Sequence, residues 1–416
     1  MFLKISFFTF YLFFCYHKHN RYHKQNTTEE FMKTIIVGGG FAGVKAALEL
    51  SKRKTGKVVL ISDEPYFLHH ATLYATATGR NMAESVIPLE NIFENHPNVQ
   101  VVQDTITGLD AQRKLVSGSK DYKYDKLILA MGSVTTYFGI TGMEKHSFGI
   151  KSIDEIKEFH KKVYTEVVEQ KLNPEYFIIG AGPTGIELAG ALHEYVQSLK
   201  ALHRLPKSRA KITVVEAAPR ILPRSSVTAS KKVEKELRKM GITVKTGKKV
   251  ESLDKDTITI DGTSYPTTTA VWTSGVANNP FFAAHADSFT LNRASRVEVN
   301  PYLEAAPHIY VVGDNNTVKH SGLALPAMIQ ATHVAKNIAR TASKRPQLKF
   351  RPHSVPSGVP TSERWAYVEW RGIYVAGRTG AWVRRMMELY GYTKLMPLAK
   401  ALAVWRAHDL PEVDAS

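Results

Sequence analysis

The chain has 416 residues, more than a single hydrophobic core typically holds, so two domains and an appendage are expected. Its apolar content of 44% excludes a disordered chain. Its one cysteine, Cys15, excludes a disulfide framework and a cysteine metal site, and its 16 histidines show no metal-ligand spacing, so no metal is assigned. The net charge of +17 comes from scattered basic residues without a recognition motif, which disfavours a nucleic-acid-binding protein. The favoured interpretation is a basic face that lies against an anionic membrane, and the alternative is an excess of basic residues on a solvated surface.

Residues 1–31 form an apolar N-terminal extension. The stretch FLKISFFTFYLFFCY is too short to span a bilayer comfortably, and Lys18, Arg21 and Lys24 follow it, whereas a secretory signal carries its positive charges in front. One interpretation is an N-terminal anchor. The favoured interpretation is that the native protein starts at Met32, because the fold is predicted to begin directly after it.

The segment TIIVGGGFAGVKAALEL predicts a strand over 34–37, a glycine loop, and a helix over 44–51. The loop contains Gly38, Gly40, Phe41, Ala42 and Gly43. In such a GxGxxG loop one glycine permits the tight turn, one lets the backbone approach a pyrophosphate, and one lets helix and strand pack closely. The helix N-terminus adds free N–H groups and partial positive charge, so a dinucleotide site is favoured over a plain turn.

Two further segments complete the predicted first domain. VVLIS, over 58–62, predicts the second strand, and Asp63 after it is placed to hold the ribose hydroxyls, with Ser62 as the alternative. DYKYDKLILAMGS predicts one strand that ends in a small-residue turn at Gly132, where the chain crosses close to a cofactor. Residues 151–170 are expected to be helical.

A second glycine loop occurs in FIIGAGPTGIELAGAL, again between an apolar strand and an alanine-rich helix. The loop contains Gly180, Gly182, Pro183, Thr184 and Gly185. Two well-separated loops imply a resident dinucleotide and an exchanging one, and a flavin with a nicotinamide can pass a hydride. Because the body of the chain lacks cysteine, electrons must leave the flavin directly for an acceptor.

The strand predicted in KITVVEAAPRILP places Glu216 where it can bind a ribose. A carboxylate there repels the 2′-phosphate of NADPH, so NADH is favoured, although Arg220 lies close enough in sequence to weaken the preference. The chain then returns to the first domain with HIYVVGDNNT, a strand ending at Gly313 and Asp314. Asp314 can accept hydrogen bonds from a ribityl chain, or it can belong to an ordinary Asp turn.

The C-terminal part begins with a proline-rich link, RPHSVPSGVP, and continues with a strand pair in WAYVEWRGIYVAGR. One or two helices with a break near Pro397 follow. They carry the stripes Trp382–Met386–Leu389 and Leu398–Leu402–Trp405, interspersed with Arg384, Arg385, Lys394, Lys400 and Arg406. This pattern is typical of a helix lying in a lipid headgroup plane, and also of an amphipathic helix packed on its own domain.

Six motifs between about Lys33 and Arg340 match one known family, namely YFLHHATLYATATG, MGSVTTYFGITGM, GAGPTGIELAG, VVEAAPRILP, AVWTSGV and VVGD. Over this stretch the chain resembles the type II NADH dehydrogenases, single-chain NADH:quinone oxidoreductases of the two-dinucleotide-domain flavoprotein superfamily. The resemblance implies an α/β fold with two Rossmann-like domains, FAD in the first site, NADH in the second, and quinone reduction without proton pumping. The expected domains are 32–150 with 286–345 for FAD, 151–285 for NADH, and 346–416 as a C-terminal domain with amphipathic helices.

Transferred to this sequence, the resemblance implies that Gly38, Gly40 and Gly43 hold the FAD pyrophosphate and Asp314 the ribityl region. It implies that Gly182 and Glu216 contact NADH, and the AVWTSGV motif adds Gly275 to the candidate cofactor residues. Glu187 matches a family glutamate near flavin and nicotinamide, where a carboxylate can tune or relay protons. The alternative interpretation is a first-turn glutamate stabilised by the helix dipole.

One departure concerns the acceptor. The family's quinone-facing helix carries AQxAxQ, and the matching ALPAMIQ has Leu325 and Ile329 in place of the two glutamines, with Gln330 directly after. Ala327 and Met328 remain able to offer backbone contacts to the flavin ring. The substitutions make the site more apolar and leave the acceptor open.

The expected protein is a peripheral flavoenzyme on the cytoplasmic face of the cell membrane, attached through its C-terminal helices and forming a homodimer. Two alternatives remain. One is a soluble NADH-dependent flavin reductase with a protein or small-molecule acceptor. The other is a slow NADH-sensing interaction protein.

Overall fold

The first half of the fold is built on a six-stranded sheet with the order β19-β20-β9-β1-β2-β5. The computed structural model describes residues 32–170, 172–205 and 210–412, so the predicted N-terminal extension and Cys15 lie outside the described residues. The strands are β1 (Lys33–Val37), β2 (Lys57–Ser62), β5 (Val99–Gln103), β9 (Lys126–Leu129), β19 (Glu304–Ala306) and β20 (Ile309–Val311). All pair in parallel except β19, which runs antiparallel to β20.

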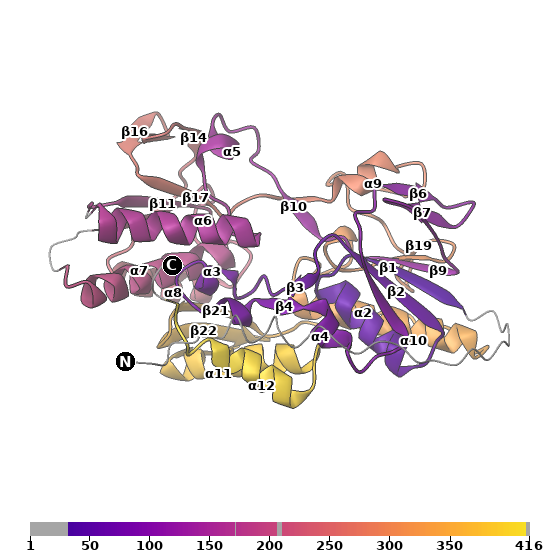
Figure 1. Ribbon diagram of the computed structural model, residues 1–416. Helices are drawn as coiled ribbons and strands as arrows, with labels where there is room; N and C mark the ends of the chain where they lie inside the picture. The colour runs from indigo at the N-terminus through magenta and orange to yellow at the C-terminus, as the bar shows by residue number, and fades with distance from the viewer. Residues whose placement is uncertain (1–31, 171, 206–209, 413–416) are drawn as a thin grey trace. The chain divides into compact units, whose positions relative to one another are not determined.

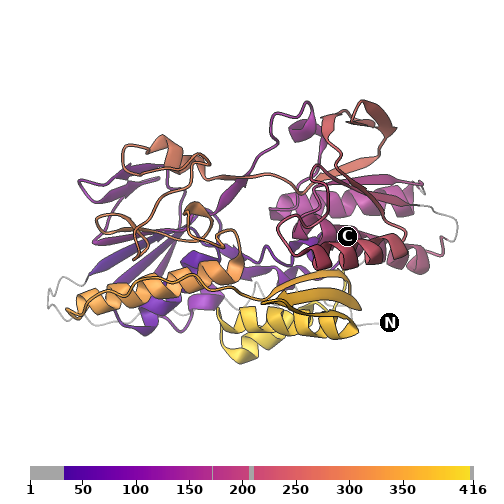
Figure 2. The ribbon, with the colours of Figure 1, turned by 180° about the vertical axis from the view of Figure 1, so that it is seen from behind.

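Both faces of this sheet are covered. Helices α2 (Phe41–Lys52) and α10 (Ala324–Ala342) pack together on one face, as Figures 1 and 2 show. On the other face, Ile35, Ile61 and Leu129 pack in one hydrophobic cluster with Val116 and Phe282. Those two residues belong to the small sheet β6 (Gly108–Asp110), β7 (Leu115–Ser117) and β8 (Asp121–Lys123), and to α9 (Pro280–Ala284). The near-continuous apolar sequence of β1 and β2 follows from this two-sided burial.

The second half repeats the pattern around a parallel four-stranded sheet with the order β13-β12-β11-β17. Its strands are β11 (Glu175–Ile179), β12 (Lys211–Glu216), β13 (Thr243–Thr246) and β17 (Thr269–Trp272). Helices α6 (Ile153–Tyr164), α7 (Pro183–Leu202) and α8 (Val227–Lys239) cluster with one face, and a short π-helical turn, η2 (Thr165–Glu169), continues α6. The antiparallel strands β14 (Val250–Leu253), β15 (Thr257–Ile260) and β16 (Thr263–Pro266) cluster with the other, together with α5 (Met143–His146).

Short elements join the halves and line their junction. The strands β10 (Ser133–Thr135) and β18 (Val276–Asn278) form a two-stranded antiparallel ribbon. The hairpin-like pair β3 (Tyr66–Leu68) and β4 (Val86–Pro88) is accompanied by α3 (Leu73–Thr76), the 3-10 turn η1 (Met82–Glu84) and α4 (Leu89–Phe93). A second 3-10 turn, η3 (Gly313–Asn315), follows β20.

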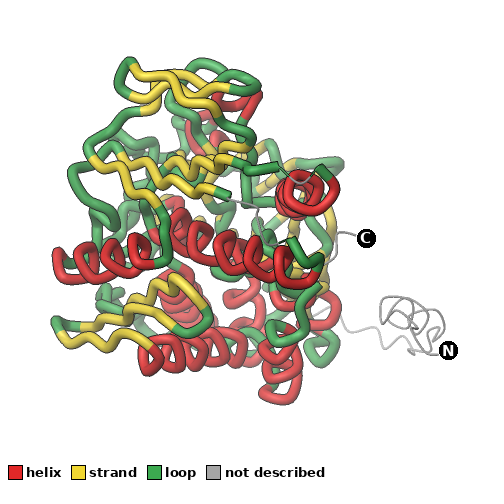
Figure 3. The backbone as a smooth tube through the Cα atoms, turned by 90° about the vertical axis from the view of Figure 1, so that its left-hand side faces the viewer, coloured by secondary structure: helices red, strands yellow, loops and turns green. Residues whose placement is uncertain are grey.

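The C-terminal region forms a three-stranded antiparallel sheet and two helices. These are β21 (Ser357–Ser362), β22 (Trp365–Trp370), β23 (Ile373–Gly377), α11 (Arg378–Thr393) and α12 (Leu398–Ala407). Figure 3 shows this small sheet between the helices of the second half and α11 with α12. Tyr392, Leu395, Met396 and Ala401 are buried in the same cluster as α2 and α10. The C-terminal helices therefore share the core of the first half.

The expected α/β fold with two Rossmann-like sheets is confirmed, and so is the helix break at Pro397, which caps α12. Two local expectations are wrong. DYKYDKLIL is not one strand, because the chain leaves the small sheet after β8 and enters the main sheet at β9, with the backbone N–H of Asp125 donating to the carbonyl of Lys33. The proline-rich link is not wholly irregular, since β21 begins inside it at Ser357 and accommodates Pro360.

Candidate functional site

The first glycine loop lies at the carboxyl end of β1, and close contacts require glycine at Gly38 and Gly43. Gly38 has a φ of +110°, and a Cβ there would lie 2.3 Å from the carbonyl oxygen of Ala130. A Cβ at Gly43 would lie 1.8 Å from the carbonyl oxygen of Gly38, so the start of α2 packs directly on the loop. A Cβ at Gly40 would meet nothing within 4 Å, which leaves open space at the helix N-terminus. This cradle fits a pyrophosphate.

The other predicted residues of the first site gather at the same edge of the sheet. A Cβ at Gly313 would lie 3.6 Å from the Cβ atoms of both Ala42 and Ala327, so the starts of α2 and α10 meet at this turn. Met328 is buried beside Ala327. The Ser133 hydroxyl donates to Asp314 Oδ2 at 3.1 Å, which links the start of β10 to the η3 turn.

Gly132 has a φ of +68° and open space where a Cβ would stand. Its backbone N–H donates to Asn315 Oδ1 at 3.0 Å, and Asn315 Nδ2 donates to the Gly132 carbonyl at 2.6 Å. Sequence reasoning missed this fully buried Asn315, although it stands in the quoted GDNNT. Its amide fixes two of the predicted site segments to each other.

Ser62 and Asp63, the two candidates for binding the ribose of the first dinucleotide, differ in their contacts with the glycine loop. Ser62 ends β2, is 3% exposed, and its hydroxyl oxygen would lie 2.3 Å from a Cβ on Gly39, so it packs against the glycine loop. Asp63 is exposed, and its Oδ1 accepts the backbone N–H of Glu64 at 3.1 Å. The two residues therefore differ in distance from the loop, and Ser62 is the one in contact with it.

The second glycine loop repeats the first. Gly180 has a φ of +109° and packs on Ser274, and a Cβ at Gly185 would lie 1.9 Å from the Gly180 carbonyl oxygen. Gly182 has open space, and Pro183 begins α7 with Thr184 exposed beside it. This second cradle has the geometry of a second dinucleotide site.

Glu216, at the end of β12, is hydrogen-bonded to this loop. Its Oε2 accepts the backbone N–H of Ala181 at 2.8 Å, and its Oε1 accepts the N–H of Ala218 at 2.8 Å. Arg220 points elsewhere, because its guanidinium donates to the carbonyls of Leu222, Pro223 and Ser225. Gly275, with a φ of +70°, packs against the Thr136 carbonyl and not against the loop.

Glu187 is the fifth residue of α7 and is 8% exposed. No acidic residue lies in the first turn of α7, so the interpretation of Glu187 as a first-turn glutamate stabilised by the helix dipole is wrong. Burial raises the pKa of its carboxyl to about 8, against the opposing effect of the Arg384 guanidinium and with a further rise from the Glu388 carboxylate. The group is therefore protonated at neutral pH.

The cation that lowers the pKa of Glu187 comes from the C-terminal region. Arg384 on α11 is 9% exposed and pairs with Glu388 at 2.8 Å, so the buried face of α11 is polar. The sequence placed Arg384 among the membrane-flanking cations. The signal that identifies it is the i,i+4 spacing of an arginine and a glutamate on a helix whose aromatic residues lie on another face.

The predicted quinone-facing segment is at the start of α10. Leu325 packs against the core of the first half, and Ile329 is half-buried. Gln330 is 1% exposed, and its Oε1 accepts hydrogen bonds from the Gly313 backbone N–H at 2.9 Å and from Asn316 Nδ2 at 2.8 Å. The shifted glutamine thus supports the η3 turn and is not a free amide facing an acceptor.

Comparison with known proteins agrees with this geometry. The chain belongs to the pyridine nucleotide-disulphide oxidoreductase family, whose model matches residues 32–339. Within that family it is similar to type II NADH:quinone oxidoreductases, at 31% identity to Ndh of Mycobacterium tuberculosis over 74% of this chain and 72% of that protein. Its identity to the Staphylococcus aureus enzyme is 27%, over 74% of this chain and 82% of that protein. The resemblance drawn from the motifs is confirmed.

The comparison with solved structures agrees on the fold. The structure of NDH2 from Plasmodium falciparum in complex with NADH matches with a TM-score of 0.81, covering 91% of this chain and 98% of that chain at 16% identity. Among the helices of the described residues, none combines the length and apolarity needed to cross a bilayer.

Proposed function

We propose that this protein is a type II NADH:quinone oxidoreductase that uses FAD and does not pump protons. The observation that carries the proposal is the pair of glycine cradles with the same close contacts, one at each main sheet, in a chain that matches such enzymes over most of its length. Bound FAD would accept a hydride from NADH and deliver two electrons to the quinone. Gly38, Gly40 and Gly43 would hold the FAD pyrophosphate, with Asp314 at the ribityl chain.

In the second cradle, Gly182 and the N-terminus of α7 would hold the pyrophosphate of NADH. Glu216 already holds Ala181 and Ala218 and presents its negative charge at the end of β12, which disfavours a 2′-phosphate. Arg220, with its guanidinium bonded to three carbonyls, does not offset that charge locally. NADH is therefore the expected donor in preference to NADPH.

Glu187 is the residue we assign to proton handling. It lies on α7 shortly after the second cradle, is nearly fully buried, and is protonated at neutral pH because burial raises the pKa of its carboxyl to about 8. A protonated carboxyl at this position can act as a general acid. The role of Glu187 is thus to hold a proton for the reduction of the acceptor.

An acceptor panel tests the proposal. We expect the purified, lipid-reconstituted protein to oxidise NADH fastest with quinone analogues, and much more slowly with a ferredoxin-like protein or a dye. Rapid dye reduction with negligible quinone reduction would favour a soluble flavin reductase, for which the apolar Leu325 and Ile329 are the motivating residues. Bleaching of the flavin by NADH with no turnover on any acceptor would favour a sensor.

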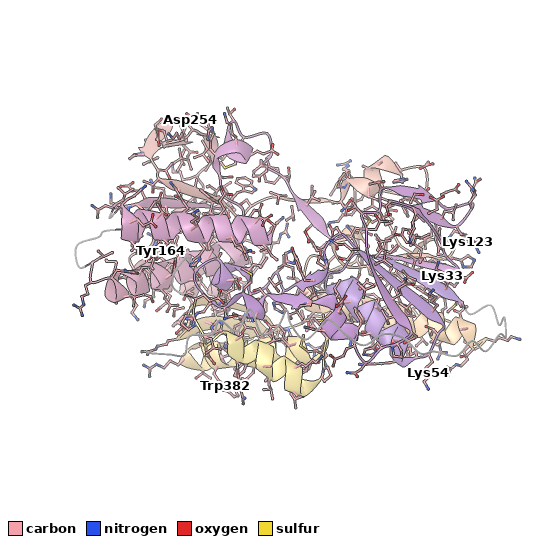
Figure 4. All side chains as sticks on the ribbon, viewed as in Figure 1. Lys33, Lys54, Lys123, Tyr164, Asp254 and Trp382 are labelled. Atoms are coloured by element: carbon pink, nitrogen blue, oxygen red, sulfur yellow. The ribbon has the colours of Figure 1, made fainter. Side chains whose placement is uncertain are left out.

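Peripheral attachment to the cytoplasmic face of the membrane is the second part of the proposal. Trp382 and Tyr390 on α11 and Leu398 at the start of α12 are 64%, 52% and 60% exposed. Figure 4 shows Trp382 at the outer side of α11, and Lys394 lies 4.1 Å from the Tyr390 ring centroid. Trp405 supports only the helix pair, because its Nε1 donates to the Arg385 carbonyl at 2.9 Å. An exposed aromatic and cationic surface suits a headgroup layer.

A deletion of the C-terminal helices is a poor test, because Tyr392, Leu395 and Ala401 belong to the core of the first half. The sharper test is the double substitution Trp382→Ser and Leu398→Ser. We expect it to reduce sedimentation with anionic liposomes while FAD content is retained. The matched control is Leu202→Ser, which removes an exposed leucine, 56% accessible, at the end of α7. Equal sedimentation of the double variant and the control would contradict attachment through these helices.

A homodimer is the third part of the proposal. The hairpin of β22 and β23 exposes Trp370, Ile373 and Tyr374, at 45%, 76% and 44%, which supports a protein contact at this edge. Sedimentation velocity of the wild type and of Ile373→Asp tests it. A wild type that stays monomeric at micromolar concentration would refute the dimer.

A further inference from the structure

A cavity of about 520 Å³ leads from the surface to Glu187. Its inner part is lined by buried residues, among them Tyr74 on α3, Glu187 on α7, and Arg384 and Glu388 on α11, which are 5–9% exposed. Its outer part is lined by exposed residues, namely Ser198, Glu363, Asp409 and Pro411. The cavity therefore connects solvent with the one side chain to which we assign proton handling.

Glu194 lines the same cavity seven residues after Glu187 on α7. Seven residues are nearly two helical turns, so the two carboxyls lie on one face of the helix and about 10 Å apart along its axis. Glu194 is half-buried, and its carboxylate accepts the backbone N–H of Glu363 at 3.1 Å. Its position is intermediate between the exposed outer lining and the buried inner lining.

The charges around the two carboxyls come from several elements. Burial raises the pKa of Glu194 to about 7, opposed by Arg80, Arg364 and His408, and Glu363, Asp409 and Arg385 also line this part. Glu187 faces Arg384 and Glu388 from α11, and Tyr74 from α3. Burial raises the pKa of both carboxyls towards neutral pH, so each can take up and release a proton.

The reaction requires such a route. In the balanced reaction, NADH, one proton and a quinone give NAD⁺ and a quinol, so each turnover takes one proton from solvent. If Glu187 donates that proton, it must be reprotonated while buried. A water molecule takes about 30 Å³ in the liquid, so a cavity of about 520 Å³ has room for a hydrogen-bonded file of water between Glu194 and Glu187.

We propose that Glu194 is the proton-relay residue of this enzyme, passing protons from solvent through the cavity to Glu187. The inference rests on the proposed function, because it assigns the proton supply of quinone reduction. Glu194 acts through Glu187 and touches no reacting atom. A purely structural role, holding the turn before β22 through the Glu363 N–H, is the competing explanation.

The test compares Glu194→Gln and Glu194→Asp with Glu234→Gln, a matched control that removes a carboxylate paired with Arg238 on α8. We expect Glu194→Gln to lower the ratio of quinone-linked turnover to flavin bleaching by about tenfold at pH 8 and by less at pH 6, where hydronium is more available. Glu194→Asp should retain most of the ratio. Imidazole or formate, small buffers that enter the cavity, should restore turnover of Glu194→Gln.

A second measurement is independent of turnover. The carboxyl stretch of Glu187, identified as the infrared band missing in Glu187→Gln, reports hydrogen–deuterium exchange at that group. We expect exchange to slow in Glu194→Gln and to be unchanged in Glu234→Gln. Wild-type exchange and turnover in Glu194→Gln would overturn the proposal, as would a deficit that is independent of pH and insensitive to buffer. Failure of the wild type to reduce any quinone would instead refute the proposed function.

Discussion

Lys45 and Glu187 occupy the same position in the two halves of the molecule, the fifth residue of the helix that follows a glycine loop. Both are buried, at 7% and 8% exposure. Lys45 pairs with Glu49 at 2.7 Å and donates to the Lys394 carbonyl at 3.1 Å. Among the described residues, by contrast, no side-chain hydrogen bond or ion pair within 4 Å engages the Glu187 carboxyl, which lines a cavity.

The difference shows how one repeated loop serves two purposes. The surroundings of Lys45 neutralise its charge and tie α2 to the C-terminal region, so the position is structural. The surroundings of Glu187 leave its proton exchangeable, with Arg384 close enough to lower its pKa and Glu388 close enough to raise it. The two loops are equivalent as phosphate cradles. The residues about one helical turn further on differ, because Lys45 is structural and Glu187 holds an exchangeable proton.

The largest expected effect comes from the third glycines. A Cβ at Gly43 or Gly185 would lie 1.8 or 1.9 Å from the carbonyl oxygen of the first glycine in its loop, so alanine must displace the cradle. We expect Gly43→Ala to lose FAD, measured by flavin absorbance after desalting. We expect Gly185→Ala to keep FAD but to slow bleaching by NADH about 100-fold in stopped flow.

The matched control for both is Gly391→Ala on α11, where a Cβ would meet nothing within 4 Å. It should be neutral. If the two loop variants lost FAD to the same extent, the assignment of one cradle to each dinucleotide would be wrong.

The next largest effect tests whether Glu187 is functional and Lys45 is structural. Glu187→Gln keeps the size of the side chain and removes the exchangeable proton, so quinone turnover should fall by about tenfold or more with FAD content unchanged. Lys45→Met should leave turnover per bound flavin unchanged but lower stability by about 1–3 kcal/mol, because the Lys394 carbonyl loses its donor and Glu49 keeps only its pair with Arg53. Turnover kinetics and thermal melting of both variants provide the measurement. A Lys45→Met variant that loses turnover would contradict the comparison.

A smaller effect concerns pH. Burial raises the pKa of the Glu187 carboxyl from 4.5 to about 8, so between these values the folded protein holds a proton that the unfolded chain has released. The resulting contribution to stability is fully present below pH 4.5 and is lost as pH rises through 8. Glu187→Gln should therefore match the wild type at pH 5 and exceed it at pH 8, by a few kcal/mol at most. Melting curves that shift equally at both pH values would argue against a protonated Glu187.

The smallest expected effect compares Glu216 at the end of β12 with Ser62 at the end of β2. Glu216→Gln replaces one of the two oxygens that accept backbone N–H groups with an amide and removes the negative charge. We expect KM for NADH to rise severalfold, which corresponds to a loss of binding free energy on the order of 1 kcal/mol. The preference of the enzyme for NADH over NADPH should become smaller. Ser62→Ala, at the corresponding end of β2, should change FAD retention only slightly. An unchanged ratio of NADH to NADPH efficiency in Glu216→Gln would mean that another group sets the preference.

The sequence by itself determined both cradles, because each depends on glycines at fixed spacing between a strand and a helix, and local backbone sterics require them. Hydrophobic periodicity was also sufficient for the α/β class, and Pro397 itself was sufficient for the helix break. Periodicity could not show that DYKYDKLIL divides between two sheets, since β8 is only the three residues Asp121–Lys123 and β9 begins after two further residues. Nor could it show that β21 begins inside the proline-rich link, since only pairing with β22 makes Ser357 to Ser362 a strand.

Only the tertiary structure decided how the site around Glu187 is completed. Arg384 and Glu388 lie about 200 residues away in sequence from Glu187, and their helix looked like a surface helix rich in cations. Whether such an arginine faces lipid or a buried carboxyl depends on which face of α11 packs inward, and that is set by contacts with β22 and the core of the first half. In the same way Gln330 looked available for an acceptor until the η3 turn placed two donors on its oxygen. Local spacing specifies a cradle, but the charge environment of a buried group is a sum over segments that only folding brings together.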